Sequence, residues 1–224
     1  MTVAAVILAA HPDTALRAVE GVANVRRLAD TAWAGGALPI VVVTFDPDGA
    51  VATALAGSPA LLATPAPQEG GPVGQVCRGI DVARSEVDGT DAALVWPARM
   101  GWVDAETVTS LIEAHGADRA TVLRPAFRGE PGWPALVPTA HLEMLRALGP
   151  ALMPGPLIEA LADGAGGRLL ELGDPGTVHD LDTARAELPP FEAPPEPAPA
   201  HQHEWGSPAA SAPDEPPDPA RTID

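Results

Sequence analysis

The first residues with chemical potential lie in a loop that follows an apolar run of strand length. The run is Val3–Ala10 (VAAVILAA), and the chain continues with His11, Pro12 and Asp13. In α/β proteins such a loop commonly holds nucleotide phosphates, because backbone N–H groups at the start of the next helix point at the phosphate oxygens. Here Pro12 has no N–H to donate, and Asp13 repels phosphate. The position of the loop predicts a nucleotide site, whereas its residue types disfavour phosphate.

Five further side chains are candidates for chemistry, and each has an alternative interpretation. His11 is placed to act as a general base, although a histidine with no visible partner is more often structural. Arg17 either supplies charge to a phosphate or forms an exposed ion pair with a neighbouring acid. Arg99 either holds a phosphate or carboxylate directly or lies on the surface. Asp180 and Asp182 either contact a metal ion or a ribose, or act locally, with Asp182 capping a following helix.

Aromatic and thiol side chains add two expectations. Trp96, Trp102 and Trp133 come from three segments that an α/β fold brings to one end of its sheet. They form either an aromatic shelf for a flat ligand or a plug that fills an unused pocket. Cys77 lies among small apolar residues and is expected to be a buried, inert thiol.

Charge and cysteine content restrict the partners of this chain. Its 224 residues carry a net charge of −17, and the pI is near 4.5. Such a surface argues against nucleic acid or an anionic membrane as a partner. The single cysteine allows no internal disulfide, which fits a reducing cytoplasm. The N-terminal apolar run is also too short to cross a bilayer, which needs about 20 residues. We therefore expect a cytoplasmic protein.

The composition divides the chain near Leu188. Residues 1–188 are expected to form one folded domain. Residues 189–224 are rich in proline, alanine and acidic residues and almost free of aliphatic side chains. Such a segment cannot bury enough apolar surface to offset its ordering entropy, so we predict a disordered acidic tail. A tail of this kind could dock a protein partner.

Apolar patterns within residues 1–188 alternate between strand and helix lengths. Strands are expected at 3–10, 38–45, 60–63, 92–96, 120–124, 135–138, 169–172 and 177–179, and helices at 22–34, 51–55, 74–85, 104–115, 141–148 and 156–162. The β-branched, fully apolar strands are typical of a parallel sheet that is covered on both faces. This alternation predicts a Rossmann-like, three-layer α/β/α domain with a mostly parallel sheet.

Taken in chain order, four segments resemble the MobA-like NTP transferases, and most nearly the molybdenum cofactor cytidylyltransferases. The family opens with LAAGxSxRMGxxK, where this chain has ILAAHPDTALRAVEG. Later in the sequence, the family has an Asp-Met-Pro turn followed by a V-x-P-E-T helix. The corresponding segment of this chain is ALVWPARMGWVDAETVTSLIEAH. A Y-x-G-x-x-G-H-P segment corresponds to FRGEPGWPALVP, and D-x-D-T corresponds to HDLDTARAEL. The resemblance spans residues 3–188 and implies a nucleotidyltransferase fold.

The resemblance also implies a set of site residues and an activity. An active member would transfer a nucleotidyl group from CTP or another NTP to molybdopterin or another phosphorylated acceptor, with Mg²⁺ as the cofactor. By position, the nucleotide-binding residues would be Ala9, Ala10, His11, Arg17 and Arg99, and the metal ligands would be Asp180 and Asp182. The expected ligand is therefore a nucleotide or a phosphorylated small molecule.

Several positions depart from the family pattern. In the first loop, where the family has Gly, Arg, Gly and Lys, this chain has His11, Ala15, Arg17 and Glu20. The metal-binding Asp of the family is replaced by Arg99, and its His is replaced by Trp133. Glu20 inverts the charge that would neutralise the triphosphate, and Arg99 removes an oxygen ligand of the metal. We therefore expect a pseudoenzyme with weak or no catalysis. The alternative is an active transferase that uses Arg17 and Arg99 as its charge clamps.

Overall fold

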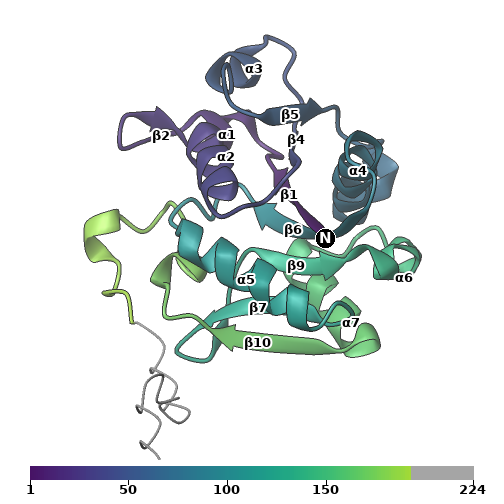
Figure 1. Cartoon of the computed structure of the whole chain (residues 1–224). Helices are drawn as coiled ribbons and strands as arrows, with labels where there is room; N and C mark the ends of the chain where they lie inside the picture. Colours follow the sequence, from purple (N-terminus) through teal and green to yellow (C-terminus); the bar gives the residue numbers. More distant parts are fainter. Residues whose placement is uncertain (193–224) are drawn as a thin grey trace, which may run out of the picture. The chain divides into compact units, whose positions relative to one another are not determined.

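The computed structural model of the protein describes residues 1–192, which lie within one compact unit. A mixed, mostly parallel sheet forms the centre of this unit (Figure 1). Within residues 1–192 the sheet has eight strands: β1 (Thr2–Leu8), β4 (Ile40–Val43), β5 (Ala60–Ala63), β6 (Thr90–Pro97), β7 (Val122–Phe127), β8 (Glu130–Pro131), β9 (Ala135–Pro138) and β10 (Gly167–Glu171). The strand order is β10-β7-β9-β6-β1-β4-β5, and β8 pairs with β7.

The register of the central strands brings several chain segments to the same edge. β1 pairs in parallel with β4 on one side and with β6 on the other, with Leu8 opposite both Val43 and Pro97. β9 runs antiparallel to β6 and β7. Because β1, β4 and β6 are parallel, the loops that follow them leave from one edge of the sheet. The chain proceeds outward from β1 to β5 and returns to β6 on the other side of β1, so a topological switch point lies between β1 and β6.

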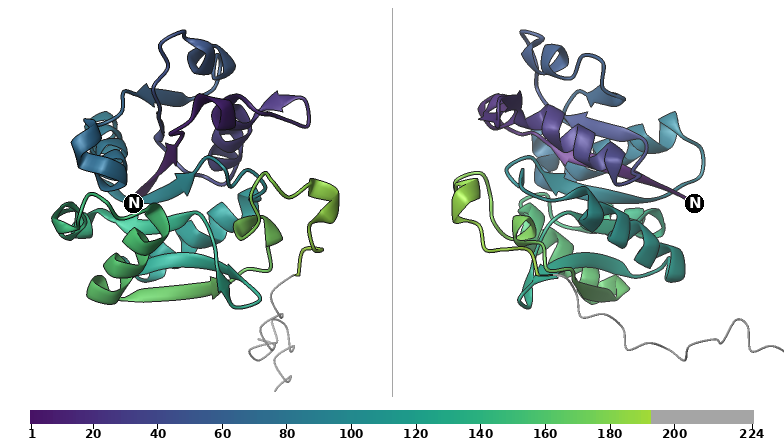
Figure 2. Two further views of the ribbon diagram at one scale, coloured as in Figure 1. Left: turned by 180° about the vertical axis from the view of Figure 1, so that it is seen from behind. Right: turned by 60° about the vertical axis from the view of Figure 1, so that its left-hand side comes forward.

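Helices cover both faces of the sheet. One hydrophobic core lies between the sheet and α2 (Asn24–Ala34) and α5 (Ala105–Ala117). A second core lies between the opposite face and α4 (Gly71–Glu86), α6 (Leu142–Ala147) and α7 (Pro154–Ala165), which are in front in the rear view (Figure 2). This arrangement confirms the predicted three-layer α/β/α class.

Short elements connect the layers. They are the helices α1 (Pro12–Leu16) and α3 (Ala50–Ala54), the hairpin of β2 (Ala18–Val19) and β3 (Val22–Ala23), and the 3₁₀ turns η1 (Gln68–Gly70), η2 (Thr139–His141), η3 (Pro175–Thr177) and η4 (Arg185–Glu187). The hairpin turn is Glu20–Gly21, and both residues have positive φ, 52° and 83°. A two-residue turn of this kind suits the twist of a hairpin, and Gly21 adopts the conformation without strain.

Three local expectations are wrong. The predicted strand at Thr177–His179 does not form, because η3 occupies Pro175–Thr177 and the Asp174 carboxylate accepts the Gly176 N–H that a strand would use. No helix begins directly after Asp182; the next helical turn within residues 1–192 is η4, whose N-cap residue is Ala184. The first strand ends at Leu8 instead of Ala10. The strands Ala60–Ala63 and Ala135–Pro138 have the predicted bounds, and the other predicted elements are present with shifted ends.

The predicted tail lies almost wholly outside the described residues, and its disorder stays a prediction. Its first residues are described as far as Glu192, whose N–H donates to the Gly173 carbonyl and whose carboxylate pairs with Arg128. No helix within residues 1–192 has the length and apolar character needed to cross a membrane.

Candidate functional site

A cleft of about 380 Å³ opens at the switch point between β1 and β6. The loop after β1 contributes Ala10, His11 and Thr14 to its wall, and the turn after β6 contributes Ala98 and Arg99. The starts of α4 and α7 close the remaining sides. In open α/β sheets the crevice at such a switch point is the usual ligand site.

Three of the predicted nucleotide-binding residues line this cleft, and two do not. Ala10, His11 and Arg99 lie in its wall. Ala9 is buried and lines a smaller neighbouring cavity with Leu8 and Phe45. The side chain of Arg17 turns toward Asp182.

The loop after β1 lacks the geometry of a phosphate cradle. It leads into α1, which has only five residues and begins with Pro12, so the first N–H is missing. Asp13 places a carboxylate in the first turn. His11 is the N-cap residue, but its side chain makes no capping hydrogen bond. The loop therefore offers an anionic phosphate neither a row of N–H donors nor a positive helix end.

The residue at the family's metal position forms an ion pair with a predicted metal ligand. Arg99 Nη2 lies 3.2 Å from Asp180 Oδ2, with the Arg99 side chain 68% exposed and that of Asp180 23% exposed. The other carboxylate oxygen of Asp180 accepts the Asp182 N–H at 3.0 Å. Both carboxylate oxygens of Asp180 are thus engaged within the chain.

The second predicted metal ligand is paired in the same way. Arg17 Nη1 donates to Asp182 Oδ1 at 3.0 Å, and Asp182 is 88% exposed. Glu20, at the family's lysine position, accepts from Arg27 and Arg185, each at 2.9 Å. Asp180, Asp182 and Glu20 therefore each form an ion pair with at least one arginine of the same chain.

These ion pairs fasten the segment 180–187 beside the loop after β1, where Figure 1 places it close to the β2 hairpin. Trp102 adds two hydrogen bonds, from Nε1 to the carbonyls of Asp180 at 3.1 Å and Thr183 at 3.0 Å. The guanidinium groups of Arg27 and Arg185 lie 5.6 and 5.9 Å from the Trp102 ring centroid. The segment is therefore bonded through both side chains and backbone.

Sequence reasoning missed Asn24, which joins the two loops of the cleft. This residue is fully buried, and its Nδ2 donates to the carbonyls of Ala98 at 2.6 Å and Thr14 at 3.2 Å. Gly101 must stay small, because a Cβ there would overlap Asn24 Oδ1 and the Leu181 side chain. A polar residue on the apolar face of the predicted helix 22–34 was the available signal.

Asp174 was missed as well. It is buried, and its carboxylate accepts from the N–H groups of Asp104 and Gly176 and from the Thr107 hydroxyl. Burial raises its pKa, while these hydrogen bonds act in the opposite direction. Asp174 fixes the start of α5, and no local sequence pattern marks it.

The three tryptophans form neither a shelf nor a plug, since none lines the cleft. Trp96 is fully buried in the core and donates to the Met100 carbonyl at 2.9 Å. Trp102 binds the segment 180–187, and Trp133 packs against Arg124, whose guanidinium lies 5.4 Å from its ring centroid. Cys77 is a buried free thiol whose pKa is raised by burial, as expected.

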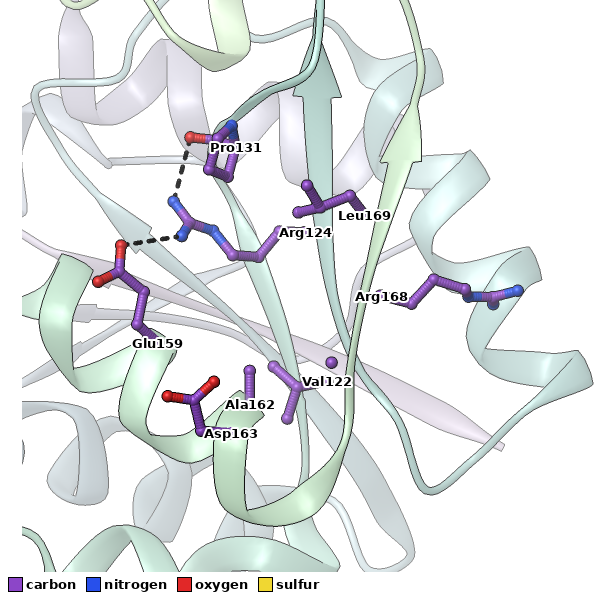
Figure 3. A pocket seen from close by; sticks show the side chains of 9 residues that line it. Val122, Arg124, Pro131, Glu159, Ala162, Asp163, Arg168 and Leu169 are labelled. Carbon is purple, nitrogen blue, oxygen red and sulfur yellow. Dashed lines mark hydrogen bonds and ion pairs between the residues drawn. The ribbon is translucent and has the colours of Figure 1, made fainter.

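A second cavity of about 290 Å³ surrounds Arg124, between β7, β10 and α7 (Figure 3). The Arg124 side chain is only 10% exposed and lies 3.7 Å from Glu159. It donates to the carbonyls of Gly132 at 3.2 Å and Pro131 at 3.1 Å. Burial lowers its pKa, with Glu159 acting in the opposite direction. Because each of its three guanidinium nitrogens faces a partner within the chain and the side chain is nearly buried, this arginine is structural.

The donor set at the cleft does not fit a divalent metal ion. Among the described residues no group of three or more His, Cys, Asp or Glu side chains is placed to hold a metal. Asp180 and Asp182 each carry a guanidinium partner instead. Mg²⁺ at a nucleotide is usually held by one or two carboxylates together with the phosphates, and here both candidate carboxylates are already paired with arginines.

Comparison with known proteins supports the fold and the family. A family model for the MobA-like NTP transferase domain matches residues 8–163. Among solved structures, a nucleotidyl transferase from Methanothermobacter is 22% identical with a TM-score of 0.61, and the match covers 76% of this chain and 86% of the other. A search of curated proteins found no match.

Two further similar structures are ligand complexes. A Mycobacterium tuberculosis protein in complex with manganese is 17% identical with a TM-score of 0.57, and the match covers 77% of this chain and 89% of the other. A CMP:2-keto-3-deoxy-manno-octonic acid synthetase in complex with CTP is 15% identical with a TM-score of 0.57, over 77% and 90% of the two chains. At these identities the similarity shows the fold alone.

Proposed function

This chain belongs to the MobA-like NTP transferase domain family, and from that premise we propose that it binds a nucleotide or phosphorylated small molecule but transfers nucleotidyl groups weakly or not at all. The observation that carries the proposal is the mutual pairing of charged groups beside the cleft. Arg99 pairs with Asp180, Arg17 with Asp182, and Glu20 with two arginines. The groups that would clamp a metal-bound triphosphate neutralise one another.

One structure of similar fold is a manganese complex, which makes a divalent metal ion a candidate cofactor for this chain. In an active member, Mg²⁺ would polarise the phosphates and neutralise charge on the leaving pyrophosphate. For this chain the ligands by position would be Asp180 and Asp182, and their arginine partners oppose that use. We therefore propose that this chain holds its ligand without a tightly bound metal.

The charged composition of the chain also disfavours a bound triphosphate. All 13 of its basic residues are arginines, so no lysine elsewhere replaces the one missing at Glu20. Glu20, in the β2–β3 turn, is already paired with Arg27 and Arg185, so the unrelieved carboxylate that a bound triphosphate would meet in the loop after β1 is Asp13. Each unrelieved like-charge contact costs on the order of 1 kcal/mol even in high dielectric.

A second candidate is an active transferase, favoured by the open cleft and by the exposed guanidinium of Arg99 at its wall. It would transfer a nucleotidyl group from CTP, which one similar structure binds, or from another NTP. The acceptor would be molybdopterin or another phosphorylated compound. An arginine can stabilise the charge that develops on transferring phosphoryl groups.

Pyrophosphate release from CTP or GTP, measured with Mg²⁺ and with molybdopterin supplied as the acceptor, separates the two candidates. We expect the natural protein to stay at the background rate. The double variant Arg99→Asp/Glu20→Lys places a second carboxylate beside Asp180 and restores the missing cation, so it should gain metal-dependent NTP binding.

The matched control is Arg168→Gln, which changes an exposed arginine on β10, far along the sheet from the cleft. It should behave as the natural protein does. Turnover by the natural protein that is lost in the double variant would establish the active-transferase candidate instead.

Two further parts of the proposal rest on composition alone. We propose that the segment beyond residue 192 tethers the domain to a protein partner, since its acidic, proline-rich composition suits a docking segment. We also propose a cytoplasmic location, on the basis of the single cysteine.

A further inference from the structure

The cleft between β1 and β6 is lined mainly by apolar side chains. Leu8, Pro72, Pro97 and Pro154 form much of its wall, and Met153 at its edge is 63% exposed. A largely apolar wall with few polar groups suits a flat ring that is removed from water on binding. Methionine sulfur also makes favourable contacts with aromatic rings. The cleft therefore fits one heterocycle.

Positive charge in the cleft comes from one side chain. Among the described residues that line it, Arg99 is the one with a permanent charge. One terminal nitrogen of Arg99 faces Asp180 at 3.2 Å, and the side chain remains 68% exposed. A guanidinium carries five N–H donors in a planar fork, so the edge not used by Asp180 can hold one anionic group with two hydrogen bonds.

A second or third phosphate group of a ligand in the cleft would lie near carboxylates. Asp13 is exposed in the first turn of α1, and Asp180 and Asp182 lie on the other side of Arg99 and Arg17. Arg17 is 49% exposed, but it is already paired with Asp182 and does not line the cleft. Each phosphate after the first therefore adds negative charge without gaining a free cation.

We infer that the cleft selects a ligand with one heterocycle and a single phosphate group, of the class of a nucleoside monophosphate, over the corresponding triphosphate. This inference rests on the proposed function, which supplies the nucleotide class. Arg99 contacts the phosphate, and the apolar wall covers the ring.

Titration calorimetry on the full chain tests the inference with four complete series. Each series contains a nucleoside and its mono-, di- and triphosphate, with cytosine, guanine, adenine or uracil as the base, and is measured with and without Mg²⁺. We expect at least one monophosphate to bind more tightly than its triphosphate, with affinity falling about fivefold for each added phosphate. Mg²⁺ should not reverse the order.

Arg99→Gln provides the second measurement. It should lower the affinity for the monophosphate about tenfold, as expected for the loss of a charge-assisted hydrogen-bonded pair, and leave the affinity for the uncharged nucleoside unchanged. The matched control Arg168→Gln should change neither. Arg99 is exposed, so its replacement leaves the core intact.

The outcomes separate this inference from the proposed function. Tighter binding of a triphosphate than of its monophosphate, with or without Mg²⁺, would overturn the inference and leave nucleotide binding established. Binding of none of the sixteen compounds would overturn nucleotide binding and the inference together. Equal losses for monophosphate and nucleoside in Arg99→Gln would show that Arg99 does not contact the phosphate.

Discussion

Arg124 and Arg99 are both ion-paired arginines of this domain, but they differ in burial. Burial decides what each side chain does. Arg124 is a residue of β7, and its side chain is 10% exposed, with carbonyl, carboxylate and aromatic partners around it. Arg99 lies at the edge of the cleft, 68% exposed, with one carboxylate partner. All three guanidinium nitrogens of Arg124 face a partner within the chain, whereas one terminal nitrogen of Arg99 faces Asp180. Access to water therefore decides whether an ion-paired arginine serves the fold alone or is available to bind a ligand.

The largest effect is expected at the buried arginine. Arg124→Ala would leave the carbonyls of Gly132 and Pro131 without donors and remove the contact with Trp133. A buried polar group left unpaired costs about 1–3 kcal/mol; the Gly132 carbonyl is buried, whereas Pro131 is exposed, so we expect a loss of about 2 kcal/mol in the free energy of unfolding. Denaturation with guanidinium chloride measures it. A loss below about 1 kcal/mol would remove the distinction between the two arginines.

A buried group without a partner should make stability depend on pH. His115 is fully buried, and neither ring nitrogen has a hydrogen-bond partner among the described residues. Burial lowers its pKa below the ordinary value, Asp91 and Asp118 act in the opposite direction, and Arg119 adds to the lowering. As the pH falls below about 6.5, the unfolded chain takes up a proton that the folded chain refuses, so stability decreases.

We expect the natural protein to lose about 1 kcal/mol more stability between pH 7.5 and 5.5 than His115→Leu, which has nothing to protonate at this position. Urea denaturation of both proteins at each pH measures the difference, and contributions from other groups cancel in it. Parallel pH profiles for the two proteins would show that His115 does not titrate differently on folding.

The smallest effect on stability is expected at the exposed pairs. Arg17→Ala and Arg99→Ala each break an ion pair that water reaches, and such pairs contribute about 0–1 kcal/mol. Either change should lower the free energy of unfolding by less than about 0.5 kcal/mol in the same denaturation assay. A loss comparable to that of Arg124→Ala would mean that the segment 180–187 is part of the folding unit's core.

The sequence predicts the fold far better than the site. The runs Ala60–Ala63 and Ala135–Pro138 form strands with the predicted bounds, because short apolar runs next to Pro and Gly specify their own limits. The pairing of Arg17 with Asp182 joins residues 165 positions apart, and no local pattern encodes it. The 3₁₀ turn at Pro175–Thr177 depends on Asp174, a residue fixed by hydrogen bonds to α5. Long-range polar contacts therefore mark the limit of sequence reasoning in this chain.

A crystal soaked with CTP and Mn²⁺, examined by anomalous scattering from the metal, tests the central claim most directly. Our account predicts that Arg99 stays paired with Asp180 and that no manganese peak lies within ligand distance of Asp180 or Asp182. A manganese ion bound to either carboxylate, with the triphosphate along residues 11–20, would contradict it.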